Sequence, residues 1–255
     1  MAVAMKSNQP SLRSRVSDSE WKVRVDLAAC YRLIAHFRMT DGTATHISAA
    51  VPGEPGAFLI NPHGMLFDEV TASSLVKIDL DGNVLLDTGW PVNKAGFVIH
   101  SAIHAGREDI NCVIHTHTRA GIAVSAMKCG MLMISQHAVR FYNRLGYHDF
   151  EGIACDLDER KRLLADLGPH KALILRNHGL IGCGTTVAEA FSVIMYMERI
   201  CESQIAAMAA GGELVFPSPE ICERTAQQYD TELNPMQGWT AHKRMLDRMD
   251  PSYAS

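Results

Sequence analysis

Apolar positions along the chain alternate between a helical spacing of three to four residues and short continuous runs that are typical of buried strands. Residues 1–16 follow neither pattern and are polar, so we expect this segment to be disordered. Apolar residues then recur at helical spacing from Val23 to Phe37, after Ser17 and Glu20, whose spacing fits a capping box. The pattern therefore predicts an amphipathic helix of about five or six turns.

Short apolar runs and glycine-containing turns follow this helix. Strands are predicted over 45–50, 57–60, 75–79, 112–115 and 172–175, and helices over 96–105, 119–127, 156–167 and 186–210. We expect Leu180–Gly182 to continue the strand that ends at Leu175, after a bend. Strands and helices thus interleave without a long linker, which favours a single α/β domain over residues 17–212. Residues 213–255 show weak periodicity, and we expect an extension that packs on this domain or on a neighbouring subunit.

The composition argues against a nucleic-acid-binding or membrane protein. The 255 residues are 47% hydrophobic and carry a formal net charge of −4 without a block of like charge, so neither nucleic acid nor an acidic membrane is an expected partner. No apolar run approaches the roughly 20 residues of a membrane span, and the N-terminus lacks the apolar centre of a secretory signal. The seven cysteines are scattered and form no CxxC pair, which is typical of reduced thiols, so we expect a cytoplasmic location.

Three histidines stand at the ends of two apolar runs. His115 and His117 follow Cys112–Ile114, and residues two apart in an extended chain point to the same side, so both imidazoles can reach one ion. His178 follows the second run beside Gly179, which lets backbone and solvent approach its ring closely. Three neutral imidazoles leave a divalent ion with its full charge and with open coordination positions. Such an ion can polarise a carbonyl group.

The sequences His115-Thr116-His117 and Asn177-His178-Gly179 resemble the metal-ligand motifs of the class II aldolase/adducin family in order and separation. Further phrases that carry the resemblance are Phe58–Gly64, Glu69–Asp79 and Ala126–Gly130. The similarity covers about residues 20–212 and is closest to the adducin-like branch. It implies a three-layer αβα fold with a mostly antiparallel or mixed central sheet, and a homotetramer with its sites near subunit interfaces. It also implies one divalent ion, of which zinc is the expected one and iron or manganese the alternatives.

The chain departs from the sugar-phosphate aldolases of this family where they carry a glutamate acid/base. The resemblance aligns that glutamate with Gly96 and two preceding serines with Lys94 and Ala95, and no carboxylate occurs between Asp87 and Glu108. Cleavage of a carbon–carbon bond beside a carbonyl needs groups that take up and return protons. We therefore do not expect a standard sugar-phosphate aldolase.

Several polar side chains are candidates for the missing group and for the pocket of a small carbonyl substrate. His137 aligns with a tyrosine that the family contributes from a neighbouring subunit. Lys94 can hold a carboxylate or a phosphate as a point charge. His100 and His104 stand four residues apart on one predicted helix face, where they either support the site or pack in the core. The candidate catalytic residues are His137, His63 and Lys94, and the candidate substrate-binding residues are His46, Gly64, Lys94 and Asn177.

Three functions fit these residues. The first, which we favour, is a metal-dependent lyase that acts on a small hydroxy- or keto-carbonyl compound through a metal-stabilised enolate. The second is a binding or scaffold protein without turnover, similar to the adducin heads, which the glycine at position 96 favours. The third is a non-haem iron oxygenase or decarboxylase, because three histidines can also hold Fe(II).

Overall fold

The computed structural model describes residues 11–92, 94–152, 159–232 and 234–255, and for 94–96 it describes the backbone alone. Residues 1–10 of the segment expected to be disordered lie outside these ranges, and Leu12–Arg15 form a single 3-10 turn, η1. Residues 156–158, at the start of one predicted helix, also lie outside the described part of the chain. In the parts described, no helix is long and apolar enough to cross a lipid bilayer.

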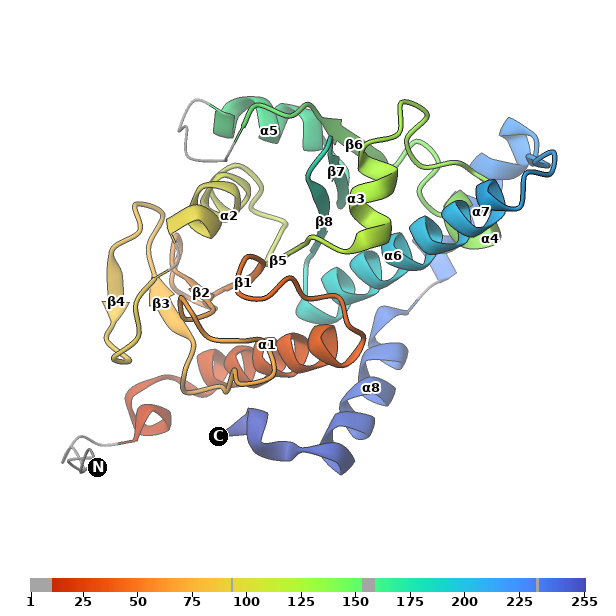
Figure 1. Cartoon of the computed structure of the whole chain (residues 1–255). Coiled ribbons are helices and arrows are strands. Elements are labelled where there is room, and N and C mark those ends of the chain that lie inside the picture. The colour runs from red at the N-terminus through yellow and green to blue at the C-terminus, as the bar shows by residue number, and fades with distance from the viewer. Residues whose placement is uncertain (1–10, 93, 153–158, 233) are drawn as a thin grey trace.

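A single eight-stranded sheet forms the middle layer of the fold (Figure 1). Its strands lie in the order β4-β3-β2-β1-β5-β8-β7-β6, and every adjacent pair is antiparallel except β6 and β7. The strands are β1 His46–Ala50, β2 Phe58–Ile60, β3 Val76–Ile78, β4 Val84–Leu86, β5 Cys112–Thr116, β6 Leu145–His148, β7 Ala172–Leu175 and β8 Gly179–Gly184. The expected mixed, mostly antiparallel sheet is therefore confirmed.

Helices cover both faces of this sheet (Figure 1). They are α1 Asp18–His36, α2 Lys94–Gly106, α3 Arg119–Ser125, α4 Gln136–Val139, α5 Glu159–Leu167, α6 Val187–Ala209, α7 Pro219–Glu232 and α8 Pro235–Met249. Ile114 and Leu180 belong to the apolar cluster that contains residues of α1 and α6, whereas Val113 and Ile181 belong to the cluster of α2 and α5. Successive strand residues point to opposite faces, so these clusters lie on the two sides of the sheet. The three-layer αβα arrangement is thereby confirmed.

The expectation that Leu180–Gly182 continues the preceding strand is wrong. β7 and β8 are separate antiparallel strands of one hairpin, with Leu175 opposite Gly179. Asn177, in the three-residue connection, has a φ of +57°, the left-handed region that asparagine tolerates better than most residues. This backbone conformation reverses the chain, so β8 returns along β7 and pairs with β5.

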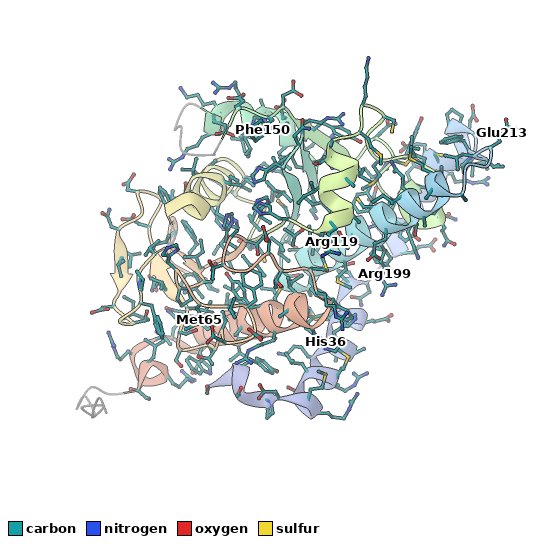
Figure 2. All side chains as sticks on the ribbon, viewed as in Figure 1. His36, Met65, Arg119, Phe150, Arg199 and Glu213 are labelled. Atoms are coloured by element: carbon teal, nitrogen blue, oxygen red, sulfur yellow. The ribbon has the colours of Figure 1, made fainter. Side chains whose placement is uncertain are left out.

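The C-terminal residues form two helices, α7 and α8, and a final 3-10 turn, η2 Pro251–Ala254. α8 contacts α1 and α6, and η2 contacts α1. Trp239 and Tyr253 are buried in these contacts, and Ser73 donates a hydrogen bond from its backbone N–H to the carbonyl of Ser255 at 3.0 Å. The segment therefore packs on the helical layer of its own chain. Figure 2 shows the side chains of the protein on the ribbon, and the exposed Glu213 lies between α6 and α7.

Candidate metal centre

The sheet topology brings the three histidines of the sequence motifs together. His115 lies in the central strand β5, and His117 follows directly after the strand end. His178 lies in the β7–β8 connection, and β8 pairs with β5 so that Leu180 stands opposite Thr116. His117 and His178, 61 residues apart in sequence, thus meet at one end of the sheet, as the HxH and NHG motifs predict.

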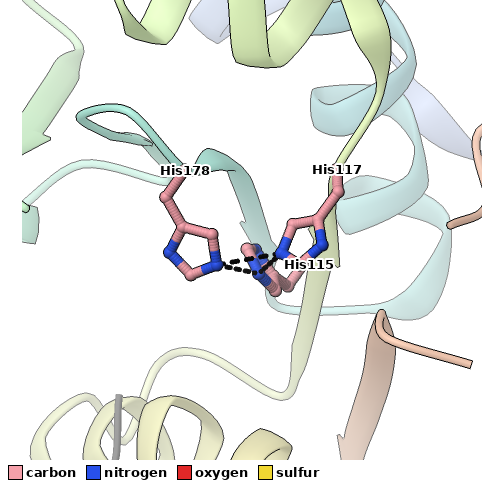
Figure 3. Close-up of side chains that lie close together, drawn as sticks. All are labelled: His115, His117 and His178. Atoms are coloured by element: carbon pink, nitrogen blue, oxygen red, sulfur yellow. Dashed lines mark hydrogen bonds between the residues drawn. The ribbon is translucent and has the colours of Figure 1, made fainter. Parts of the chain in front are cut away.

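The Nε2 atoms of the three rings point toward one another (Figure 3). They are 2.8 Å apart for His115 and His117, 2.9 Å for His117 and His178, and 3.3 Å for His115 and His178. Three nitrogens that each lie 2.0–2.1 Å from a tetrahedral zinc ion are roughly 3.3 Å apart from one another. The observed triangle is close to this size, and shifts of a few tenths of an ångström would adjust its two short edges.

Hydrogen bonds at the far side of two rings fix which nitrogen faces the centre. His115 Nδ1 lies 3.0 Å from the carbonyl oxygen of Leu180, and His117 Nδ1 lies 3.1 Å from Oδ2 of Asp41. A carbonyl or carboxylate oxygen only accepts, so each Nδ1 carries the hydrogen and a neutral ring presents a lone pair on Nε2. The lone pairs on Nε2 of His115 and on Nε2 of His117 then face each other at 2.8 Å and repel one another. A cation bound between the two nitrogens would remove this repulsion.

Burial keeps two of these rings in the form that binds metal. Desolvation lowers the pKa of His115 well below its usual value, and the neighbouring His46 and His178 lower it further. Burial also lowers the pKa of His178 to about 4, with smaller contributions from His117 and His148. Both imidazoles are therefore neutral at pH 7, which is the form that ligates metal ions.

Gly179 allows the two strands to approach at this centre. A Cβ atom at this position would lie 2.4 Å from the carbonyl oxygen of Thr116 and 3.1 Å from Cδ2 of His117. Any larger residue would therefore displace β5 or the His117 ring. The exposed side chain of Asn177 precedes His178, and the backbone of Asn177 shapes the turn that holds this ring. Its proposed contact with substrate stays a prediction.

The remaining candidate residues lie at different distances from the centre. His46 is buried beside it, opposite His115 in the β1–β5 register, and their ring centroids are 5.0 Å apart. His63 and Gly64 are exposed in the turn after β2, and the backbone N–H of His63 donates to Pro91. The side chain of Lys94 lies outside the described residues.

His137 is not joined to the centre by any contact among the described residues. It lies on the short helix α4, its ring centroid is 4.9 Å from that of Tyr196, and it lines a cavity of about 380 Å³ with residues of α6 and α8. The role predicted for His137 depends on a neighbouring subunit, so it stays a prediction.

Two buried side chains near the centre, those of Ser48 and Thr118, were not predicted from the sequence. Ser48 of β1 lies between the rings of His100 and His104. Thr118, the residue after His117, donates a hydrogen bond to Glu198 of α6 and caps the start of α3. Ser48 follows His46 by two residues, so the alternation of a strand is the signal that places both on one face.

The variant Asp41→Ala tests whether the carboxylate beside His117 Nδ1 contributes to metal binding. We expect Asp41→Ala to weaken zinc binding about tenfold to a hundredfold, because carboxylates that orient a ligating imidazole typically contribute that much. The affinity is measured by competition with a chromophoric chelator at pH 7. Asp68→Ala, at another exposed aspartate, is the matched control. Equal affinities of the two variants would contradict the orienting role of Asp41.

The chain is similar to known proteins in sequence and in fold. The sequence matches the family model described as Class II Aldolase and Adducin N-terminal domain over residues 25–205. A solved structure of an aldolase II superfamily protein from Pseudomonas syringae is 51% identical, with a TM-score of 0.93 over 96% of this chain and 100% of that one. L-fuculose 1-phosphate aldolase from Glaciozyma antarctica PI12 is 26% identical, with a TM-score of 0.83 over 92% of each chain. Alpha-adducin of Rattus norvegicus is 47% identical over 193 residues, which are 74% of this chain and 26% of that protein.

The fold and the site define an αβα protein whose sheet presents three converging histidines. The chain belongs to the class II aldolase/adducin family, since the family model covers most of its length. The resemblance inferred from the motifs is therefore confirmed. The chain spans about a quarter of alpha-adducin, so the similarity to that protein concerns one part of it.

Proposed function

We propose that the chain is a divalent-metal-dependent lyase that acts on a small hydroxy- or keto-carbonyl compound. The observation that carries the proposal is the convergence of three Nε2 atoms within 2.8–3.3 Å of one another. A zinc ion held by them, or iron or manganese as alternatives, would supply an electrophile for a carbonyl oxygen. Three protein ligands leave a coordination position for substrate, as in catalytic rather than structural zinc sites.

Other residues of the chain would orient the ligand rings and transfer protons. The backbone carbonyl of Leu180 and the carboxylate of Asp41 hold two ligand rings in one tautomer. The resemblance aligns Gly96 with the family's glutamate acid/base, so proton transfer falls to other groups, and the buried His46, whose ring centroid lies 5.0 Å from that of His115, is a candidate. The Glaciozyma antarctica relative is named for a sugar phosphate. The absence of that glutamate separates this chain from such an activity.

The proposal includes the expected assembly. We propose a homotetramer in which the metal centre lies near a subunit interface, so that His137 of one copy can reach the centre of another. The exposed position of His137 beside a cavity supports this arrangement. A cytoplasmic location is part of the same proposal.

A scaffold function without turnover is the second candidate. The identity of 47% to alpha-adducin over 193 residues supports it, together with the glycine at position 96. In that case the three histidines would bind metal and stabilise the fold, and no carbonyl compound would react.

Turnover assays distinguish the two candidates. Protein loaded in turn with zinc, manganese or iron is incubated with hydroxy-keto acids and hydroxy-aldehydes, and products are followed by NMR. We expect metal-dependent cleavage that falls at least a hundredfold in His115→Ala and is unchanged in His36→Ala, since His36 is an exposed histidine at the end of α1. Protein that binds the ions and cleaves none of these compounds would contradict the lyase and favour the scaffold.

A further inference from the structure

The segment that joins α6 to α7, residues 212–218, exposes large apolar side chains to solvent. Val215 is 86% exposed and Phe216 is 52% exposed, and Met208 and Ile221 at the flanking helix ends are exposed as well. Single exposed apolar residues are ordinary on a protein surface, whereas a cluster of them marks a site of interaction. The α6–α7 segment therefore has the surface of a contact that its own fold does not supply.

The backbone of the α6–α7 segment is also without partners. Residues 212–218 form neither helix nor strand, and the backbone N–H groups of residues 213–216 donate no hydrogen bond to any described residue. Pro217 and Pro219 stiffen the chain, because proline fixes its own φ and holds the preceding residue in an extended conformation. A stiff, extended segment loses little conformational entropy when it binds.

A cavity between α4, α6 and α8 lies elsewhere on the same chain. Its volume is about 380 Å³, and its lining includes the apolar side chains of Phe191, Met195 and Trp239. The rings of Phe191 and Trp239 meet edge to face, with centroids 5.5 Å apart. An apolar cavity of roughly 150 Å³ already accepts a benzene ring, so the α4–α6–α8 cavity has room for a phenylalanine and a valine side chain.

The charges of the segment and of the cavity are complementary. Arg199, His137 and His242 line the cavity, and no carboxylate belongs to its lining in the described part of the chain. Arg199 forms no ion pair with another described residue. The α6–α7 segment contains Glu213 and neither lysine nor arginine. Opposite charges at the rim of an interface guide two surfaces together and fix their orientation.

The segment and the cavity do not meet within one chain. Val215 and Phe216 are exposed, and neither of them lines the cavity. Arg199 precedes the last residue of α6 by about ten positions, which is roughly 15 Å along a helix. Figure 2 shows Glu213 beyond that end of α6, away from Arg199. Two complementary surfaces at different places on one chain are suited to a head-to-tail contact between copies.

We propose that the α6–α7 segment of one copy binds in the α4–α6–α8 cavity of a second copy of this chain. Val215 and Phe216 enter the cavity and pack on its aromatic side chains, and Glu213 pairs with Arg199 at the rim. The proposal rests on the homotetramer of the proposed function and names the surfaces that join its copies. Each copy gives its segment to the next, and the tetramer closes when the contacts form a ring. Because His137 lines the same cavity, the contact brings a neighbouring copy to its side chain.

Two variants remove the two sides of this contact separately. Phe216→Ser changes an exposed side chain of the segment, so the fold of the single chain is unaffected. Gly238→Trp blocks the cavity, because Gly238 lines it and a Cβ atom there would meet no other atom within 4 Å. The matched controls are Phe150→Ser, at another exposed phenylalanine, and Thr240→Trp, at an exposed position of α8 outside the cavity lining.

Sedimentation velocity over a series of protein concentrations measures the dissociation constant between copies. We expect both controls to associate as the wild type does, and we expect the dissociation constant to rise about thirtyfold or more in Phe216→Ser and in Gly238→Trp. Buried aromatic residues contribute most of the binding energy of an interface, which is the reason for this large effect. Both variants are expected to keep the wild-type zinc affinity, because all three ligand histidines belong to one chain.

A mixture of the two variants tests which surfaces meet. Phe216→Ser retains the cavity and Gly238→Trp retains the segment, so a pair of these chains has one intact contact. We expect each variant alone to sediment as a monomer, and we expect the equimolar mixture to form one-to-one dimers and nothing larger. An interface elsewhere on the molecule would not produce this pattern.

The outcomes separate failure of the contact from failure of the proposed function. Variants that assemble as the wild type does, or a mixture that contains no dimer, would overturn the contact and leave the homotetramer and the lyase intact. A wild type that sediments as a monomer at every concentration would contradict the contact and the homotetramer together. Sedimentation does not depend on turnover, so a failure of the lyase shows only in the assays of cleavage.

Discussion

Replacing His178 with alanine is expected to weaken zinc binding about a hundredfold to a thousandfold. Tetrahedral zinc sites in proteins bind with roughly 10–16 kcal/mol, shared among about four ligands, so the loss of one ligand removes a few kcal/mol. His178 comes from the β7–β8 turn, whereas the other two rings come from β5, so its loss removes one side of the triangle. The affinity is measured at pH 7 by competition with a chromophoric chelator.

His36→Ala is the matched control for this variant, because it removes an exposed imidazole at the end of α1. We expect the control to bind one zinc ion with the affinity of the wild type. Circular dichroism of both variants checks that the fold is kept. An unchanged affinity in His178→Ala would show that the ion binds elsewhere.

Acidification from pH 7 to pH 5 is expected to lower the free energy of unfolding of the metal-free protein by several kcal/mol. Burial lowers the pKa values of His46, His100 and His104 in the folded protein, the last to about 4, whereas free histidine titrates near pH ~6.5. Below that pH the unfolded chain binds protons that the folded protein excludes, so stability falls as the pH falls. Each such group contributes a slope of up to about 1.4 kcal/mol per pH unit.

Urea unfolding at several pH values between 7 and 5 measures this slope, with chelator present to keep the protein free of metal. We expect His104→Phe to make the slope shallower, because one of the excluded protons is removed, while His36→Ala keeps the wild-type slope. A free energy of unfolding that stays constant between pH 7 and pH 5 would show that these rings accept protons inside the folded protein.

Much of the fold and the centre could be predicted from the sequence. The apolar runs at 112–115 and 172–175 and the capping boxes of α1 and α6 lie where the structure has these elements. The HxH and NHG motifs predicted that the three imidazole rings converge, because each motif follows a buried strand. The αβα layering came from the family resemblance, since local periodicity does not say how strands are ordered in a sheet.

The errors and omissions have local physical causes. The hairpin of β7 and β8 depends on a positive φ at Asn177, and a sequence does not show whether a non-glycine residue adopts it. α7 buries only Cys222 and Ala226, so its apolar pattern is too sparse to predict a helix. The contact of Ser48 with the rings of His100 and His104 depends on the helix that covers β1, which no local pattern reveals.

The direct test of the central claim is a crystal structure of the protein grown with zinc, with anomalous diffraction measured on both sides of the zinc absorption edge. The account predicts one strong anomalous peak per chain, roughly 2.0–2.1 Å from Nε2 of His115, His117 and His178. A peak at other residues, or three rings that turn away from one another with no peak between them, would contradict it.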